Sequence, residues 1–186
     1  MQAATYANLR QHLRTFFVGH ESEEYIWTIG PAFTELPRLR MAEFAPGPKF
    51  HGWVYATIGA WEAGPESGLE FLITAPHKNP RHVELLAMTA WYHVKEGLGL
   101  GHTFPIGEPW LPGSACEFML VSLPYPFGPS LEVICNIPHC HLRYLWLLPI
   151  TREERELKSQ EGQEALEQRF DDCAIDSTDP LRASVV

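Results

Sequence analysis

The stretch RYLWLLPITREERELKSQEGQEALEQRF, residues 143–170, changes character at a single position. It is almost wholly apolar up to Ile150 and crowded with charged side chains from Thr151 onward. Thr151 with Glu154 three positions later is the pattern of a capping box, in which each side chain accepts a hydrogen bond from the other residue's backbone amide. The stretch therefore predicts a buried strand that passes directly into a helix.

Two residues of this stretch limit the length of its strand and of its first helix. Pro149 has no N–H group, so we expect it to block further pairing of the strand. Gly162 interrupts the helix, which restarts with Leu166 and Phe170 one turn apart on the same face. The apolar content falls after this second helix, so residues 173–186 are predicted to be a flexible C-terminal tail.

The rest of the chain predicts further helices and strands without regular alternation. We expect helices over 2–19 and from Pro80 to about 94, and strands over 25–30, 38–45, 52–60, 69–74, 117–123 and 131–137. The irregular order argues against a doubly wound parallel sheet. The prediction is one α+β domain over residues 1–172, with a mixed, mostly antiparallel β-sheet flanked by helices.

Composition and charge restrict the kind of partner. The chain of 186 residues is 45% hydrophobic and 20% charged, as in ordinary globular proteins. Its net charge of −9 disfavours nucleic acid, which requires a basic surface. Residues 1–20 lack the apolar segment of a signal peptide, and no apolar run approaches the ~20 residues of a membrane span. We therefore expect a cytoplasmic protein with no membrane or nucleic-acid partner, whose cysteines are reduced.

Patterns of catalytic or metal-binding chemistry are sparse. The segment PHCH, residues 138–141, is the densest group of metal-ligand side chains, yet only His139 and His141 would share one face of a strand. A structural zinc site requires four ligands, usually in two spaced pairs, so we expect no metal and no cofactor. The chain also has no G-x-S-x-G motif, and we expect no catalytic residues. A metal-dependent or Cys/His hydrolase that uses this His-rich surface is the alternative function.

Several segments resemble the Suppressor of Fused domain family. In the family's C-terminal signature a Leu-Pro-Ile strand end precedes an acidic position, a Gly and a helix with Leu and Phe. Residues at these positions here are Leu148, Pro149, Ile150, Glu154, Gly162, Leu166 and Phe170. The segments 52–61, 69–76 and 118–127 are similar to three strands of the family, and order and spacing agree from about 25 to 170. Leu157 departs from the family, which commonly has an aromatic residue there.

This resemblance implies a Suppressor of Fused-like domain of the bacterial single-domain type, which binds proteins and is not an enzyme. The animal family member is a negative regulator that sequesters a transcription factor by clamping a short peptide. Bacterial single-domain relatives occur among immunity proteins, which neutralise a cognate toxin. The resemblance supplies no catalytic residue and no binding residue for this chain.

The predicted partner is another polypeptide, such as a basic toxin domain. Between residues 151 and 186 the chain has ten acidic and five basic residues. Complementary charge increases the rate of association with a basic partner. We therefore predict a binding surface that includes Glu153, Glu156 and Glu164. The competing hypothesis is a groove lined by aromatic residues such as Trp53, Tyr55 and Trp110.

Overall fold

The computed structural model describes residues 2–63, 68–134 and 142–186. These residues form an 8-stranded mixed sheet in the order β1-β2-β3-β4-β8-β6-β5, with β7 also paired to β8. The strands are β1 (Ser22–Ile26), β2 (Arg40–Phe44), β3 (Trp53–Ile58), β4 (Leu69–Ala75), β5 (Thr103–Pro105), β6 (Phe118–Ser122), β7 (Val133–Ile134) and β8 (Leu142–Ile150). The expected α+β domain with a mixed, mostly antiparallel sheet is confirmed.

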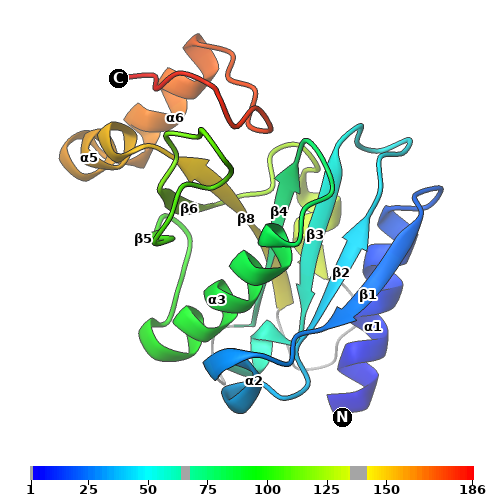
Figure 1. Cartoon of the computed structure of the whole chain (residues 1–186). Coiled ribbons are helices and arrows are strands. Elements are labelled where there is room, and N and C mark those ends of the chain that lie inside the picture. The colour runs from blue at the N-terminus through cyan, green and yellow to red at the C-terminus, as the bar shows by residue number, and fades with distance from the viewer. Residues whose placement is uncertain (1, 64–67, 135–141) are drawn as a thin grey trace.

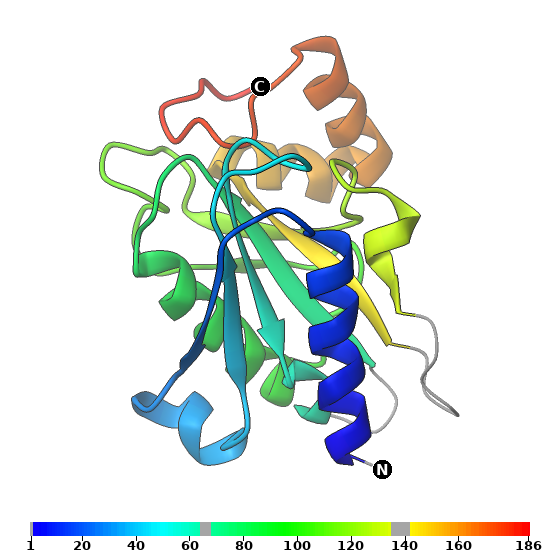
Figure 2. The same ribbon diagram turned by 90° about the vertical axis from the view of Figure 1, so that its right-hand side faces the viewer.

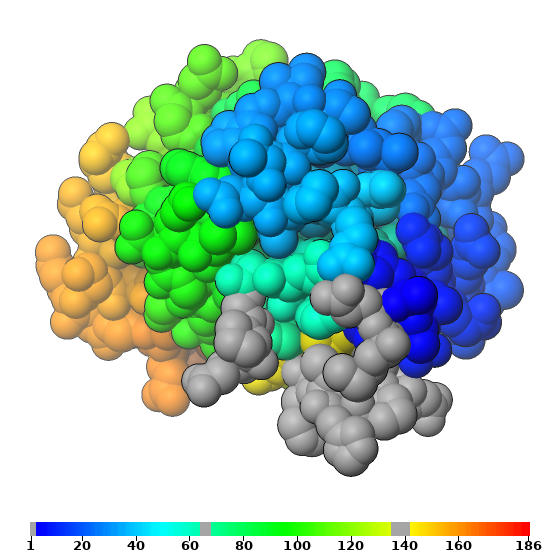
Figure 3. Space-filling model, turned by 90° about the horizontal axis from the view of Figure 1, so that it is seen from below, coloured from blue at the N-terminus to red at the C-terminus, as the bar shows by residue number. Residues whose placement is uncertain are grey.

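Helices cover both faces of this sheet. They are α1 (Gln2–Phe16), α2 (Gly30–Glu35), α3 (Arg81–Glu96), α4 (Pro129–Glu132), α5 (Arg152–Glu161) and α6 (Gln163–Asp172), with a 3-10 turn η1 (Ala60–Ala63). Helix α3 lies on one face and α1 on the other (Figures 1 and 2). Seen from the end away from the chain's C-terminus, α2 lies beside α3 (Figure 3).

Strand β8 lies in the interior of the sheet, between β4 and β6. It runs parallel to β4, with Leu72 opposite Trp146, and antiparallel to β6, with Leu120 opposite Leu148. The remaining strand pairs are antiparallel. Because β8 contributes side chains to both faces, it joins the two halves of the hydrophobic core.

The predicted strand-to-helix junction is confirmed. The Thr151 hydroxyl accepts a hydrogen bond from the Glu154 amide at 3.3 Å, and the Glu154 carboxylate accepts one from the Thr151 amide at 2.8 Å. Gly162, with φ +96°, separates α5 from α6. Leu157, Leu166 and Phe170 of these helices pack into the core on the α1 side of the sheet.

Some element boundaries differ from the sequence prediction. The strand expected over 25–30 is β1, which begins at Ser22, while Gly30 and Pro31 begin helix α2. Proline at the first turn suits a helix because its missing N–H has no intrahelical partner there. The segment expected as a strand over 131–137 contains the end of α4 and the short β7, and its residues 135–137 lie outside the described residues.

The C-terminal segment does not form the free tail that was expected over residues 173–186. The chain returns across α5 and α6 after Cys173 (Figure 2), and the side chain of Arg182 is buried against Glu154. Amphipathic periodicity gave no signal for this packing, because the segment has no regular secondary structure. The charged side chain of Arg182 and the backbone amide of Val185 both reach back to Glu154 at the start of α5.

Candidate functional site

Glu154 and Arg182 form the most buried ion pair among the described residues. Arg182 donates through Nη1 to Oε1 of Glu154 at 2.6 Å and through Nη2 to Oε2 at 2.7 Å. The same carboxylate accepts from the Val185 amide at 3.2 Å, and Arg182 Nη2 also donates to the Pro149 carbonyl at 3.0 Å. Because both carboxylate oxygens of Glu154 already accept hydrogen bonds within the fold, Glu154 has a structural role and is not available to bind a ligand.

Glu70 is a second buried carboxylate. It accepts hydrogen bonds from the Thr57 hydroxyl at 2.5 Å and the Gly59 amide at 2.7 Å, with Ala60 and Trp61 amides further away. Burial raises the pKa of Glu70 to about 7, and these hydrogen bonds oppose the rise. The donors lie at the end of β3 and in the turn from β3 into η1, so Glu70 holds this turn against β4.

The described buried histidines are part of the core. His82 stacks on Tyr55 at 5.0 Å between ring centroids, and its Nδ1 lies 3.1 Å from the Asn79 carbonyl. Burial lowers the pKa of His82 to about 4 and also lowers the pKa of His93. Both rings are therefore neutral near pH 7, as expected for histidines packed among aromatic side chains.

Metal or thiol chemistry has little support within the described residues. No group of three potential metal-ligand side chains occurs there. The cluster at 138–141, on which the hydrolase alternative depended, lies outside the described residues, as do Cys135 and Cys140. Cys116 is buried, and burial raises the pKa of its thiol, which makes the thiol less reactive. Cys173 is exposed.

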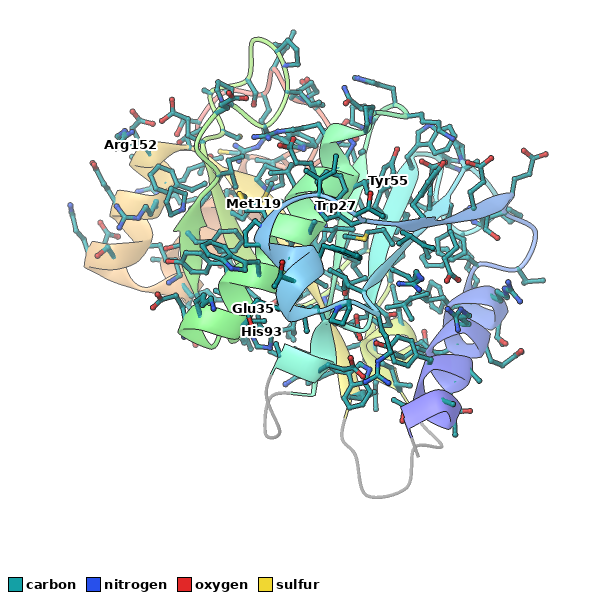
Figure 4. All side chains as sticks on the ribbon, turned by 60° about the horizontal axis from the view of Figure 1, so that its bottom comes forward. Trp27, Glu35, Tyr55, His93, Met119 and Arg152 are labelled. Atoms are coloured by element: carbon teal, nitrogen blue, oxygen red, sulfur yellow. The ribbon has the colours of Figure 1, made fainter. Side chains whose placement is uncertain are left out.

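The aromatic residues of the competing hypothesis do not line a common groove. Tyr55 and Trp110 are fully buried in the core on the α3 side of the sheet. Trp53 is half-buried, with the Lys78 ammonium 5.5 Å from its ring. Figure 4 places Tyr55 inside the molecule, whereas Arg152 projects from α5 at one edge. Successive residues of a strand face opposite sides of the sheet. The sequence pattern did not show that helices cover both faces of this sheet, so it did not predict the burial of Tyr55.

The three predicted acidic residues are exposed, but they belong to two different helices. Glu153 and Glu156 lie on α5 and Glu164 lies on α6. Helix α5 has four acidic and three basic residues, and its Arg152 pairs with Glu117 at 3.0 Å. Helix α6 has four acidic residues and one basic residue. The acidic character of this region is therefore concentrated on α6.

A groove lies beside α6, and sequence reasoning did not identify it. It has a volume of about 520 Å³ and is bounded by α6 and the segment after it, by the turn after β6 and by residues of β6 and β8. Its acidic members are Glu167 and Asp171 of α6. A signal was present in the sequence: the acidic pair Asp171 and Asp172 ends a helix, where basic residues are favoured.

The fold and these sites define an α+β domain in which the buried carboxylates of Glu70 and Glu154 are hydrogen-bonded within the fold. The chain belongs to the Suppressor of fused protein (SUFU) family, whose family model matches residues 36–183. A crystal structure described as a SUFU homologue from Neisseria gonorrhoeae FA 1090 is 35% identical, with a TM-score of 0.88, and the match covers 99% of this chain and 98% of that chain.

Two more distant structures share the fold. The Sufu–Fu complex structure matches with 14% identity and a TM-score of 0.68, covering 97% of this chain and 92% of that chain. Drosophila Suppressor of Fused matches with 14% identity and a TM-score of 0.59, and the match covers 97% of this chain but 50% of that one. The comparison with curated proteins gave no match. Among the described helices, none has the length and apolar character needed to cross a membrane.

Proposed function

We propose that this domain binds another polypeptide through the region of α5 and α6 and holds that partner inactive. The observation that carries the proposal is membership of the SUFU family, in which the Sufu–Fu structure is by its name a complex. The buried carboxylates of Glu70 and Glu154 are hydrogen-bonded within the fold, and the buried His82 ring is stacked on Tyr55, which favours a binding role over a catalytic one. We infer no catalytic residue and no cofactor.

The acidic surface favours a basic partner. Glu153, Glu156 and Glu164 are exposed, and the chain carries a net charge of −9. Charges at the rim of an interface act mainly on the association rate and on its dependence on salt. A toxin with a basic domain has the matching charge, so we propose that the domain is an immunity-type protein that neutralises a toxin. In this proposal it acts in the cytoplasm, where the thiols of Cys116 and Cys173 stay reduced.

Co-expression tests the neutralising role. The gene beside that of this protein is expressed alone and together with this protein, and growth of the cells is measured. We expect growth to stop with the neighbouring gene alone and to recover when this protein is present. Growth that is the same in both cultures would contradict the immunity role.

Charge reversal tests the acidic surface separately. The partner captured by the wild-type protein is measured against a variant in which Glu153, Glu156 and Glu164 are all changed to Lys. We expect slower association for the variant and a smaller loss of rate at high salt. Equal association rates for the two proteins at low and at high salt would show that these three residues lie outside the interface.

A further inference from the structure

The groove beside α6 has an apolar floor. Leu120 of β6 and Trp146 and Leu148 of β8 line it from the sheet, and Phe170 lines it from α6. These four side chains belong to the core on the α1 side of the sheet. All four are buried, with at most 7% of each residue exposed, so an apolar side chain of a partner placed in the groove would pack directly against the core.

The end of α6 forms one wall through an unusual backbone conformation. The Ile175 amide donates to the Phe170 carbonyl at 3.2 Å, and the Ala174 amide donates to the Asp171 carbonyl at 3.0 Å. These two hydrogen bonds form a Schellman motif, which usually has glycine at the left-handed position. Here Ala174 occupies that position with φ +46°. The motif directs Ile175 back toward Phe170, and both side chains line the groove.

The rim of the groove is negative. Glu167 and Asp171 are one helical turn apart on α6, and both border the groove. Glu167 accepts hydrogen bonds from the Gln163 amide at 2.6 Å and the Tyr125 hydroxyl at 3.3 Å. Asp171 makes no ion pair with another described residue.

Asp171 also lies where the helix dipole opposes it. The C-terminal turn of a helix carries a partial negative charge, so an aspartate there is locally unfavourable and a bound cation is favoured. Residues that break a local rule without an evident gain in stability are expected at functional sites. The aspartate at the end of α6, beside an apolar floor, therefore matches a ligand that combines an apolar group with a positive charge.

We propose that this groove binds a short segment of a partner polypeptide, with one apolar side chain over Trp146 and Leu148 and a neighbouring Lys or Arg against Glu167 and Asp171. The volume of about 520 Å³ is typical of sites for small ligands and accommodates a few side chains. This inference rests on the proposed function, because it names the part of the surface and the chemistry of the segment that the domain recognises.

Two matched variants test the groove. Asp171→Lys reverses a charge on its rim, and Asp172→Lys makes the same change at the next residue, which does not line the groove. Both residues are exposed, and a lysine at the end of a helix is favoured by the dipole. Both variants should therefore unfold at the wild-type temperature or above, which separates an effect on binding from an effect on folding.

The probe is a phage-displayed library of random linear peptides, selected on the immobilised wild-type protein. We expect the enriched peptides to share an apolar residue next to Lys or Arg. A synthetic peptide of the most enriched sequence should bind Asp171→Lys about tenfold more weakly than wild type, and Asp172→Lys within roughly threefold of wild type. Its binding should also shift the indole N–H resonance of Trp146.

Two results of the peptide experiments would show that the groove is not the binding site. One is a selection that yields no peptides, or peptides without basic residues. The other is equal binding of the enriched peptide to Asp171→Lys and Asp172→Lys, without a shift of the Trp146 resonance. If the partner protein is still captured by Asp171→Lys as well as by wild type, polypeptide binding stands and the groove alone is wrong. If the wild-type protein also captures no partner protein, the proposed function is wrong as well as the groove.

Discussion

Arg182 and Glu154 are 28 residues apart in the sequence and form a buried, bidentate ion pair, with N–O distances of 2.6 and 2.7 Å. The side chain of Glu154 is fully buried and that of Arg182 is 6% exposed. The pair connects the last residues of the chain to the first turn of α5. It makes the C-terminal segment a structural part of the domain.

Arg182→Ala should destabilise the domain by about 3 kcal/mol, because removal of one partner leaves the other charge buried and unpaired. Urea denaturation measures the change. Arg169→Ala is the matched control, since Arg169 is exposed on α6, and it should change stability by less than about 0.5 kcal/mol. Truncation after Asp172 should be at least as harmful as Arg182→Ala. A truncated protein with the wild-type midpoint would show that the ion pair contributes nothing.

Thr151→Ala should cost about 1 kcal/mol of unfolding free energy, because the first turn of α5 loses its cap. Thr151→Ser retains the hydroxyl and should recover most of that loss. Thermal and urea unfolding of the two variants measure this difference. If the serine variant is as unstable as the alanine variant, the methyl group of Thr151 matters more than its hydrogen bond.

Glu70→Gln should change how stability depends on pH. Burial raises the pKa of Glu70 from 4.5 to about 7, so the folded state favours the protonated acid. Its contribution to stability is largest below pH 4.5 and is lost as pH rises toward 7, by up to about 3 kcal/mol. His82 acts in the opposite direction, because its lowered pKa makes the protein less stable as pH falls below 6.5.

The difference in unfolding free energy between wild type and Glu70→Gln isolates the glutamate. It should grow in favour of wild type as pH is lowered from about 7 to 4.5. Urea denaturation across this range gives the difference. Glu96→Gln makes the same chemical change at an exposed position of α3 and is the control. A difference for Glu70→Gln that does not change with pH would mean that Glu70 titrates alike in the folded and unfolded chains.

Ala174→Gly should stabilise the domain by about 1 kcal/mol, since glycine adopts the left-handed conformation without the steric cost of a Cβ atom. Among the described non-glycine residues, Ala174 is the one with positive φ. Ala183→Gly makes the same chemical change at an ordinary φ and should give no gain. Differential scanning calorimetry of both variants distinguishes the two effects, and a lower melting temperature for Ala174→Gly would contradict the argument.

Local chemistry made the junction at Thr151 predictable, because a capping box lies within four consecutive residues. The α+β class followed in the same way from the irregular order of apolar segments. The start of β1 was missed because Ser22, Glu23 and Glu24 form an exposed edge strand, and polar residues there resemble a loop.

The site was less predictable for a different reason. Exposure of Glu153, Glu156 and Glu164 followed from a charged helix, but their role in binding remains a prediction. The burial of Tyr55 and Trp110 depends on helices packed from distant parts of the chain. The groove combines residues of β6, β8 and α6, so no single segment carries its pattern. Sequence reasoning had no means to pair Arg182 with Glu154 across 28 residues.

The parallel pairing of β4 with β8 has a consequence for folding of the protein during its synthesis on the ribosome. Strands β1 to β4 follow one another as antiparallel neighbours, and they can associate while later residues are still being synthesised. Every residue of β4 is buried in the finished protein, yet its outer edge stays unpaired until Leu142–Ile150 has emerged. Unpaired apolar edges promote aggregation. We therefore expect nascent chains that stall before β8 to need protection by a chaperone, whereas the released protein does not.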